Sequence, residues 1–172
     1  IAWSLGWFRL LDILKDKRAL PQAIIGISAA IKFKNSLIRM IIQSFKKNHK
    51  KFFTDFDPWL FSKEEKKSAN FNQWNELILR YRIKSRDSLL EDLLFLENID
   101  LTPYLQRFNT PILLISGKED IICPLDEAMK LSNALPASRI EIMDTGHIPF
   151  LTKIGEFNKI TERYIREVSD DS

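Results

Sequence analysis

The chain has little cysteine, little glycine and no long apolar run, and each shortage excludes a class of protein. Cys123 is the only cysteine among 172 residues, which excludes an internal disulfide framework and a zinc site built from cysteines. Five glycines and seven prolines exclude a collagen-like or low-complexity chain. The longest apolar stretch, residues 23–31, is far shorter than the roughly 20 residues that a membrane helix needs.

The remaining composition is that of a globular protein. Apolar residues make up 45% and charged residues 28%, which is too apolar for a disordered chain. Residues 1–8 are apolar but lack the basic leader and cleavage site of a secretory signal. We therefore expect a reduced, cytoplasmic setting with no membrane partner, and the sequence implies no metal or other cofactor.

Basic side chains gather in the first third of the chain. The net charge is +3, but residues 1–51 carry +9 and the remainder carries −6. Residues 32–51 contain seven basic side chains and no acidic one. Such a segment attracts acidic partners over about 10 Å at moderate salt, although a solvated helix face also explains many basic runs. A nucleic-acid binder is a weak alternative, because the aromatic residues are spaced like core residues and no binding motif accompanies them.

Hydrophobic patterning predicts strands that alternate with helices. In chain order, the pattern predicts helix 7–17, strand 23–29, a helical stretch from about 35 to 107, strand 111–116, helix 125–135, strand 139–143 and helix 154–168. Capping-box spacings at Ser62–Glu65 and Ser88–Glu91 mark helix starts inside the long helical stretch. This order predicts an α/β fold with a doubly wound parallel sheet, interrupted by a helical subdomain.

Ser4 lies in a sequence typical of a nucleophile elbow. In Ala2-Trp-Ser-Leu-Gly6, small residues stand two positions before and after the serine, where a tight strand-to-helix turn is expected to be crowded. Ala2 replaces the more usual first glycine. A serine flanked by alanine and glycine is common, so this motif alone is weak evidence for a catalytic serine.

Asp120 and His147 strengthen that interpretation. They follow the predicted strands 111–116 and 139–143, at the edge where the ligand crevice of an open α/β sheet lies. A serine hydroxyl needs an adjacent base, which a histidine supplies, and an aspartate can fix the tautomer of that histidine. Alone, Asp120 also suits a turn and His147 a structural role. Together with Ser4, in the chain order of α/β-hydrolases, they predict a catalytic triad, with the Leu5 N–H as one oxyanion donor.

On these motifs the chain resembles the C-terminal two-thirds of an α/β-hydrolase with a helical cap. Within that superfamily it most resembles the carboxylesterases of biotin synthesis that act on pimeloyl-acyl-carrier-protein methyl ester. The resembling segments are residues 3–6, 25–33, 96–105, 111–124, 146–151 and 156–157. The resemblance implies Ser4, Asp120 and His147 as the triad, Leu5 as an oxyanion donor, and Trp3, Phe56 and Phe150 near the acyl pocket.

The resemblance also implies a domain division and a partner. It divides the chain into a first core part at 1–34, a helical cap at 35–107 and a second core part at 108–172. It implies an acidic acyl-carrier protein as partner, docked on the basic residues where the cap begins, namely Lys46, Lys47, Lys50 and Lys51. Trp7 departs from the family, whose members usually carry a small residue there. The chain opens without an initiator Met, and we expect the N-terminal strands of a complete hydrolase to be absent from it.

The leading hypothesis is a serine carboxylesterase acting on an acyl-carrier-linked methyl ester. One alternative keeps the triad and changes the substrate to another small ester, a lactone or a carbon–carbon bond, and substrate profiling separates it from the leading hypothesis. Another alternative is an inactive, truncated hydrolase fragment. The sequence predicts no oligomeric state.

Overall fold

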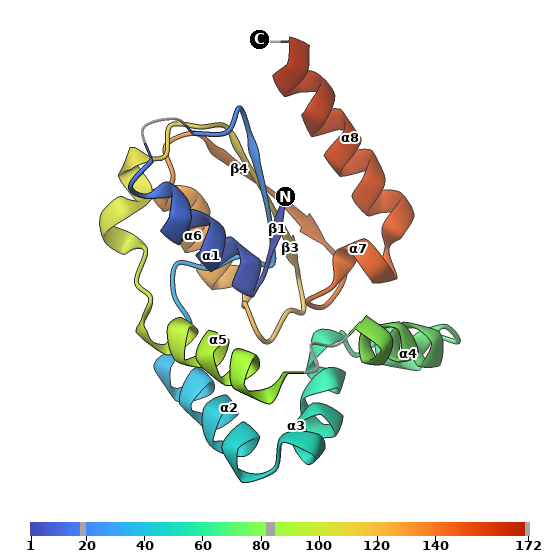
Figure 1. Ribbon diagram of the computed structural model, residues 1–172. Helices are drawn as coiled ribbons and strands as arrows, with labels where there is room; N and C mark the ends of the chain where they lie inside the picture. Colours follow the sequence, from blue (N-terminus) through green and yellow to red (C-terminus); the bar gives the residue numbers. More distant parts are fainter. Residues whose placement is uncertain (18–19, 82–84, 171–172) are drawn as a thin grey trace.

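A parallel β-sheet forms the centre of the structure (Figure 1). The computed structural model describes residues 1–17, 20–81 and 85–170. Within these residues the strands are β1 (Ala2–Trp3), β2 (Ile24–Ile27), β3 (Ile112–Gly117) and β4 (Ser138–Met143). They are arranged in the order β1-β2-β3-β4, and each neighbouring pair is parallel. The predicted α/β class with a parallel sheet is confirmed.

Helices cover both faces of this sheet. Helices α1 (Leu5–Leu14) and α6 (Leu125–Ala134) lie on one face, and α8 (Ile154–Asp170) lies on the other (Figure 1). Alternate strand residues separate the two sides: Ile24 and Leu114 belong to the cluster that contains α1, whereas Ile25 and Leu113 pack with Phe157 of α8. Because β2 and β3 are buried on both faces, their sequences are apolar without alternation.

A helical insert separates β2 from β3 and lies beyond the carboxyl ends of the strands (Figure 1). It contains α2 (Asn35–Lys47), α3 (His49–Phe56), the 3₁₀ turns η1 (Asp57–Leu60) and η2 (Glu65–Lys67), α4 (Phe71–Tyr81) and α5 (Arg86–Asn98). The turn η3 (Thr102–Arg107) leads back to β3, and α7 (Pro149–Thr152) precedes α8. An ion pair of 2.8 Å between Arg9 of α1 and Asp92 of α5 ties the insert to the core.

The first strand was not predicted. Ala2 and Trp3 pair with Gly26 and Ile27 of β2, so a short strand leads into the serine turn. Two residues are too few for a hydrophobic period to show in the sequence. The N-terminal strands were expected to be absent, and β1 corrects that expectation for the strand that leads into the turn at Ser4.

Two local predictions from the sequence, a helix start at Ser88 and crowding at Gly6, were wrong. Helix α5 begins at Arg86 and is capped by Ser85, whose Oγ accepts a hydrogen bond from Ser88 N at 3.3 Å, so Ser88 lies inside the helix. Gly6 was expected to be crowded but is exposed, and a Cβ there would meet no atom of another described segment within 4 Å. The side of α1 that carries Gly6 is open in the described part of the chain.

Trp7 packs inside the core. Its side chain is fully buried, and its Nε1 donates a hydrogen bond of 3.1 Å to the carbonyl of Ala30. A Cβ on Gly26 would lie 2.8 Å from the indole ring. The large residue on α1 is thus matched by a glycine on β2, which lets the helix approach the sheet closely.

Candidate active site

Ser4 stands at the turn between β1 and α1. Its φ of 51° and ψ of −116° are a strained conformation for a residue with a side chain. Its N–H donates to the carbonyl of Ile27 at 2.9 Å, and its own carbonyl accepts from Trp7 N at 3.0 Å. The sheet and the first turn of α1 therefore hold the backbone of Ser4 in a shape that presents Oγ at the carboxyl edge of the sheet.

Asp120 lies in the loop after β3, and its carboxylate is buried. Oδ1 accepts hydrogen bonds from Ile122 N and Cys123 N, both at 2.9 Å. These two donors fix the orientation of the carboxylate and leave Oδ2 facing His147. Burial raises the pKa of the neighbouring Cys123 thiol well above its usual range, and the charge of Asp120 raises it further.

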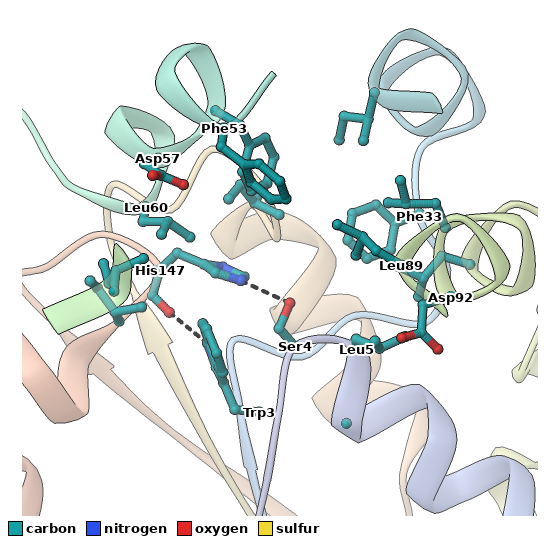
Figure 2. A pocket seen from close by; sticks show the side chains of 18 of the residues that line it. Trp3, Ser4, Leu5, Phe33, Phe53, Asp57, Leu60, Leu89, Asp92 and His147 are labelled. Carbon is teal, nitrogen blue, oxygen red and sulfur yellow. Dashed lines mark hydrogen bonds between the residues drawn. The ribbon is translucent and has the colours of Figure 1, made fainter. Parts of the chain in front are cut away.

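His147 joins Ser4 to Asp120. Its Nδ1 lies 2.7 Å from Asp120 Oδ2. Its Nε2 lies 2.8 Å from Ser4 Oγ, a contact that Figure 2 marks with a dashed line. Because a carboxylate only accepts hydrogen bonds, Nδ1 carries the proton and Nε2 is free to accept from the serine hydroxyl. The structure thus brings the three predicted residues into one continuous series of hydrogen bonds, and this series can move the Ser4 proton to an imidazole.

The backbone of His147 is also held on both sides. Its carbonyl accepts from Trp3 Nε1 at 3.0 Å and from Ser28 Oγ at 2.9 Å. Its N–H donates to the carbonyl of Leu60, in the helical insert, at 2.8 Å. Sequence reasoning missed Ser28, a buried residue at the end of β2 with a φ of 49°. A serine directly after the apolar strand 24–27 was its only signal.

An apolar cavity of about 600 Å³ opens over Ser4 and His147. The three predicted pocket residues, Trp3, Phe56 and Phe150, all line it. Trp3 packs edge-on against Phe150, with ring centroids 5.2 Å apart. Ser4, Leu5 and His147 line it too. The sequence did not single out further lining residues such as Phe33, Phe53, Leu60, Leu89 and Asp92 (Figure 2). They come from the loop before α2 and from several helical elements of the insert, and no local motif relates them.

Curated proteins resemble this chain over part of its length. No family model matches the chain. A protein from Pseudomonas syringae, provisionally named carbamate hydrolase RutD, is 35% identical over 60 residues, which are 35% of this chain and 23% of that protein. The pimeloyl-[acyl-carrier protein] methyl ester esterase of Vibrio atlanticus is 31% identical over 86 residues, which are 49% of this chain and 33% of that protein.

Solved structures match nearly the whole chain. The esterase EaEST from Exiguobacterium antarcticum superposes with a TM-score of 0.77 at 21% identity, covering 98% of this chain and 65% of that one. The enol-lactonase from Burkholderia xenovorans superposes with a TM-score of 0.85 at 14% identity, covering 95% of this chain and 64% of that one. The chain has part of the α/β-hydrolase fold. It spans just under two thirds of the length of these two solved hydrolases.

In this hydrolase fold Leu5 occupies the first position of α1 and lines the cavity. The first amide groups of a helix have no partner within the helix, so the Leu5 N–H can donate to a developing oxyanion beside Ser4. Within the described ranges, no group of three or more His, Cys, Asp or Glu side chains is arranged to hold a metal ion. The helices of those ranges also include none that is long and apolar enough to cross a membrane.

The predicted docking lysines lie on the helical insert of the hydrolase fold. Lys46 and Lys47 are exposed in the last turn of α2. Lys51 is exposed on α3 and forms an ion pair of 2.6 Å with Asp55. The side chain of Lys50 lies outside what the structure describes. Lys46, Lys47 and Lys51 do not line the cavity over Ser4.

Proposed function

We propose that this chain is the catalytic part of a serine carboxylesterase that hydrolyses an acyl methyl ester. The observation that carries the proposal is the unbroken hydrogen-bond series Ser4–His147–Asp120 beside an apolar cavity. A hydroxyl, an imidazole and a carboxylate in this order are the groups that acyl transfer to serine needs. The names of the partial relatives and of the solved neighbours agree with a hydrolase.

In the first half of the reaction, Ser4 Oγ attacks the ester carbonyl while His147 Nε2 takes its proton. Asp120 stabilises the imidazolium, and the Leu5 N–H stabilises the oxyanion. The imidazolium then gives its proton to the departing alkoxide, so methanol leaves and the acyl group stays on Ser4. In the second half, His147 deprotonates a water molecule that attacks the acyl-enzyme. The acid is released and Ser4 regains its proton.

We propose a pimeloyl chain on an acyl-carrier protein as the acyl group, in a reduced, cytoplasmic setting. The cavity supports this, because its walls are mostly apolar and a methylene chain needs no polar partner. Two Vibrio relatives named as pimeloyl-[acyl-carrier protein] methyl ester esterases also support it. The test is a panel of the carrier-linked ester, short alkyl esters and lactones. A higher kcat/KM for a short ester or a lactone would contradict the pimeloyl substrate.

The acidic carrier would dock on Lys46, Lys47, Lys50 and Lys51. Helix α3 links this surface to the cavity, because Phe52, Phe53 and Phe56 of the same helix line the cavity. The exposed Lys51–Asp55 pair is worth only about 0.3–0.5 kcal/mol, so an acidic partner can replace Asp55 at little cost. The four lysines also belong to residues 32–51, a basic segment that contains no acidic residue.

Charge reversal tests this docking surface. Changing the four lysines to glutamate should raise KM for the carrier-linked ester and leave KM for a short ester unchanged. A smaller test uses the double variant K46E/K47E, with K159E/R166E as its charge-matched control. Lys159 and Arg166 suit the control because they are exposed on α8, away from the insert (Figure 1). Equal losses for both substrates, or equal effects of the two pairs, would contradict carrier docking.

Labelling with a fluorophosphonate probe tests the reaction itself. The adduct is read by intact mass and peptide mapping, with Ser4→Ala as control. A single adduct on Ser4, absent from the variant, supports the proposal. A folded chain without an adduct contradicts activity of this chain and supports an inactive fragment. If a longer native form that contains the chain also remains unlabelled, the triad assignment is wrong.

A further inference from the structure

One short segment of the helical insert contacts the two loops that carry Asp120 and His147. It is residues 60–65, which run from the last residue of η1 to the first residue of η2. The carbonyl of Leu60 accepts from His147 N at 2.8 Å. Lys63 N donates to the carboxylate of Glu119, the neighbour of Asp120, at 3.2 Å. This segment therefore touches the backbone of the histidine loop and the residue before the triad acid.

Glu65 makes the strongest of these links. Its Oε2 accepts hydrogen bonds from Ser62 N at 2.6 Å and from Gly146 N at 2.9 Å. Its own N–H donates to Ser62 Oγ at 3.1 Å, which completes a capping box. The side chain of an ordinary capping glutamate stays in water, whereas Glu65 is only 6% exposed. A carboxylate at such a position is costly to bury unless N–H groups compensate it.

The glycine next to His147 makes this contact possible. A Cβ on Gly146 would lie 2.7 Å from both the carbonyl oxygen of Leu60 and the backbone nitrogen of Ser62. Any larger residue would push the histidine loop away from the insert. The backbone N–H groups of Gly146 and His147 thus both donate hydrogen bonds to the segment 60–65. The carbonyl of His147 instead accepts from Trp3 and Ser28 of the core.

We propose that Glu65 is a positioning residue for His147, acting through the peptide groups of the histidine loop. Its Oε2 holds Gly146 N, which fixes the peptide that carries the imidazole and so the 2.8 Å contact between His147 Nε2 and Ser4 Oγ. Oε1 has no hydrogen-bond partner among the described residues. Oε2 alone thus makes both contacts. For holding Gly146 N, the length of the side chain therefore matters more than its charge. The effect on catalysis rests on the proposed function.

Two substitutions at Glu65 separate the effect of side-chain length from the effect of charge. Glu65→Gln keeps the length of the side chain, and its one amide oxygen can accept from both N–H groups. Glu65→Asp keeps the charge but is one methylene too short to bond Ser62 N and Gly146 N together. Glu64→Asp is the matched control, because Glu64 is exposed and pairs with Lys67 on the surface.

The first readout is hydrolysis of 4-nitrophenyl acetate. We expect Glu65→Asp to lower kcat by about 10- to 100-fold with KM changed by less than about 3-fold, because misplacing a catalytic group by about 1 Å costs up to this factor. Glu65→Gln should stay within about 3-fold of the parent kcat. Thermal unfolding records any loss of stability separately. A folded Glu65→Asp with the parent kcat, or an equal loss in both variants, would overturn the proposal.

The second readout needs no turnover. The chain has two histidines, so ¹⁵N-histidine labelling and a His49→Gln variant assign the His147 Nδ1 proton, which bonds Asp120 Oδ2 at 2.7 Å. Its resonance should shift or broaden in Glu65→Asp and not in Glu65→Gln. If the parent hydrolyses no ester and takes no probe while this pattern holds, the proposed function fails and the positioning role stands. The same resonance in all three proteins would refute the positioning role.

Discussion

Replacing Asp120 with asparagine tests the proposed triad at the group that sets the histidine tautomer. Asp120 Oδ1 accepts from Ile122 N and Cys123 N, and Oδ2 faces His147 Nδ1. Asparagine has nearly the same shape but only one oxygen. That oxygen must stay with the two buried backbone donors, because leaving both without an acceptor costs about 1–3 kcal/mol each. The amide nitrogen of the asparagine then faces His147 Nδ1.

Two N–H groups cannot hydrogen-bond to each other, so His147 must change tautomer. Nδ1 becomes the acceptor, and Nε2 carries the proton that it would otherwise take from Ser4. A triad in the wrong tautomer loses about 10⁴ in kcat, which corresponds to about 5.5 kcal/mol of transition-state stabilisation. The geometry of the loop is unchanged, so KM should change by less than about 3-fold.

The assay compares kcat and KM for 4-nitrophenyl acetate in the parent, Asp120→Asn and Asp126→Asn. Asp126 is a fair control, because it is exposed on α6 and only pairs with Lys130 at the surface. Thermal unfolding shows whether each variant is folded. A folded Asp120→Asn that keeps more than about a tenth of the parent kcat would refute the argument, because the tautomer would then not depend on Asp120.

Three further predictions follow from the packing. Gly26→Ala should lower the free energy of unfolding by about 1–3 kcal/mol, because its Cβ would meet the Trp7 ring at 2.8 Å; chemical denaturation measures this, and unchanged stability would contradict the packing. Burial raises the pKa of the Cys123 thiol, so iodoacetamide at pH 8 should alkylate the folded chain at least about 100-fold more slowly than the unfolded chain. Comparable alkylation rates for the two states would contradict this. Trp3→Phe removes the donor to the His147 carbonyl but keeps a ring beside Phe150, so kcat for a short ester should fall about 3- to 10-fold, whereas an unchanged kcat would show that this bond is dispensable.

The parts of the fold that a local pattern specifies were predictable from the sequence. The strand predicted at 111–116 is observed at Ile112–Gly117, and the one at 139–143 is observed at Ser138–Met143. Apolar runs bounded by turn residues carry this information within a few positions. Asp120 and His147 were found by the same means, since each follows a strand whose end could be located.

Features that depend on a distant partner were not predictable. Trp7 was seen only as a departure from the family, because the sequence does not show that Gly26 lies beneath its ring. The cavity walls have the same limit: Phe33, Phe53 and Leu89 come from three different segments that only the tertiary fold brings together. Their apolar character was visible, but their common position was not.

The two capping-box spacings show why a local motif alone does not determine a role. Ser88–Glu91 has the pattern and is not a cap, because Ser85 starts α5 earlier. Ser62–Glu65 has the pattern and forms the box, yet its glutamate also reaches Gly146, 81 positions along the chain. That contact needs a glycine and a buried loop that no pattern at 62–65 contains. A capping glutamate that is buried rather than solvated therefore indicates a second partner, and in this fold the partner is the loop that holds His147.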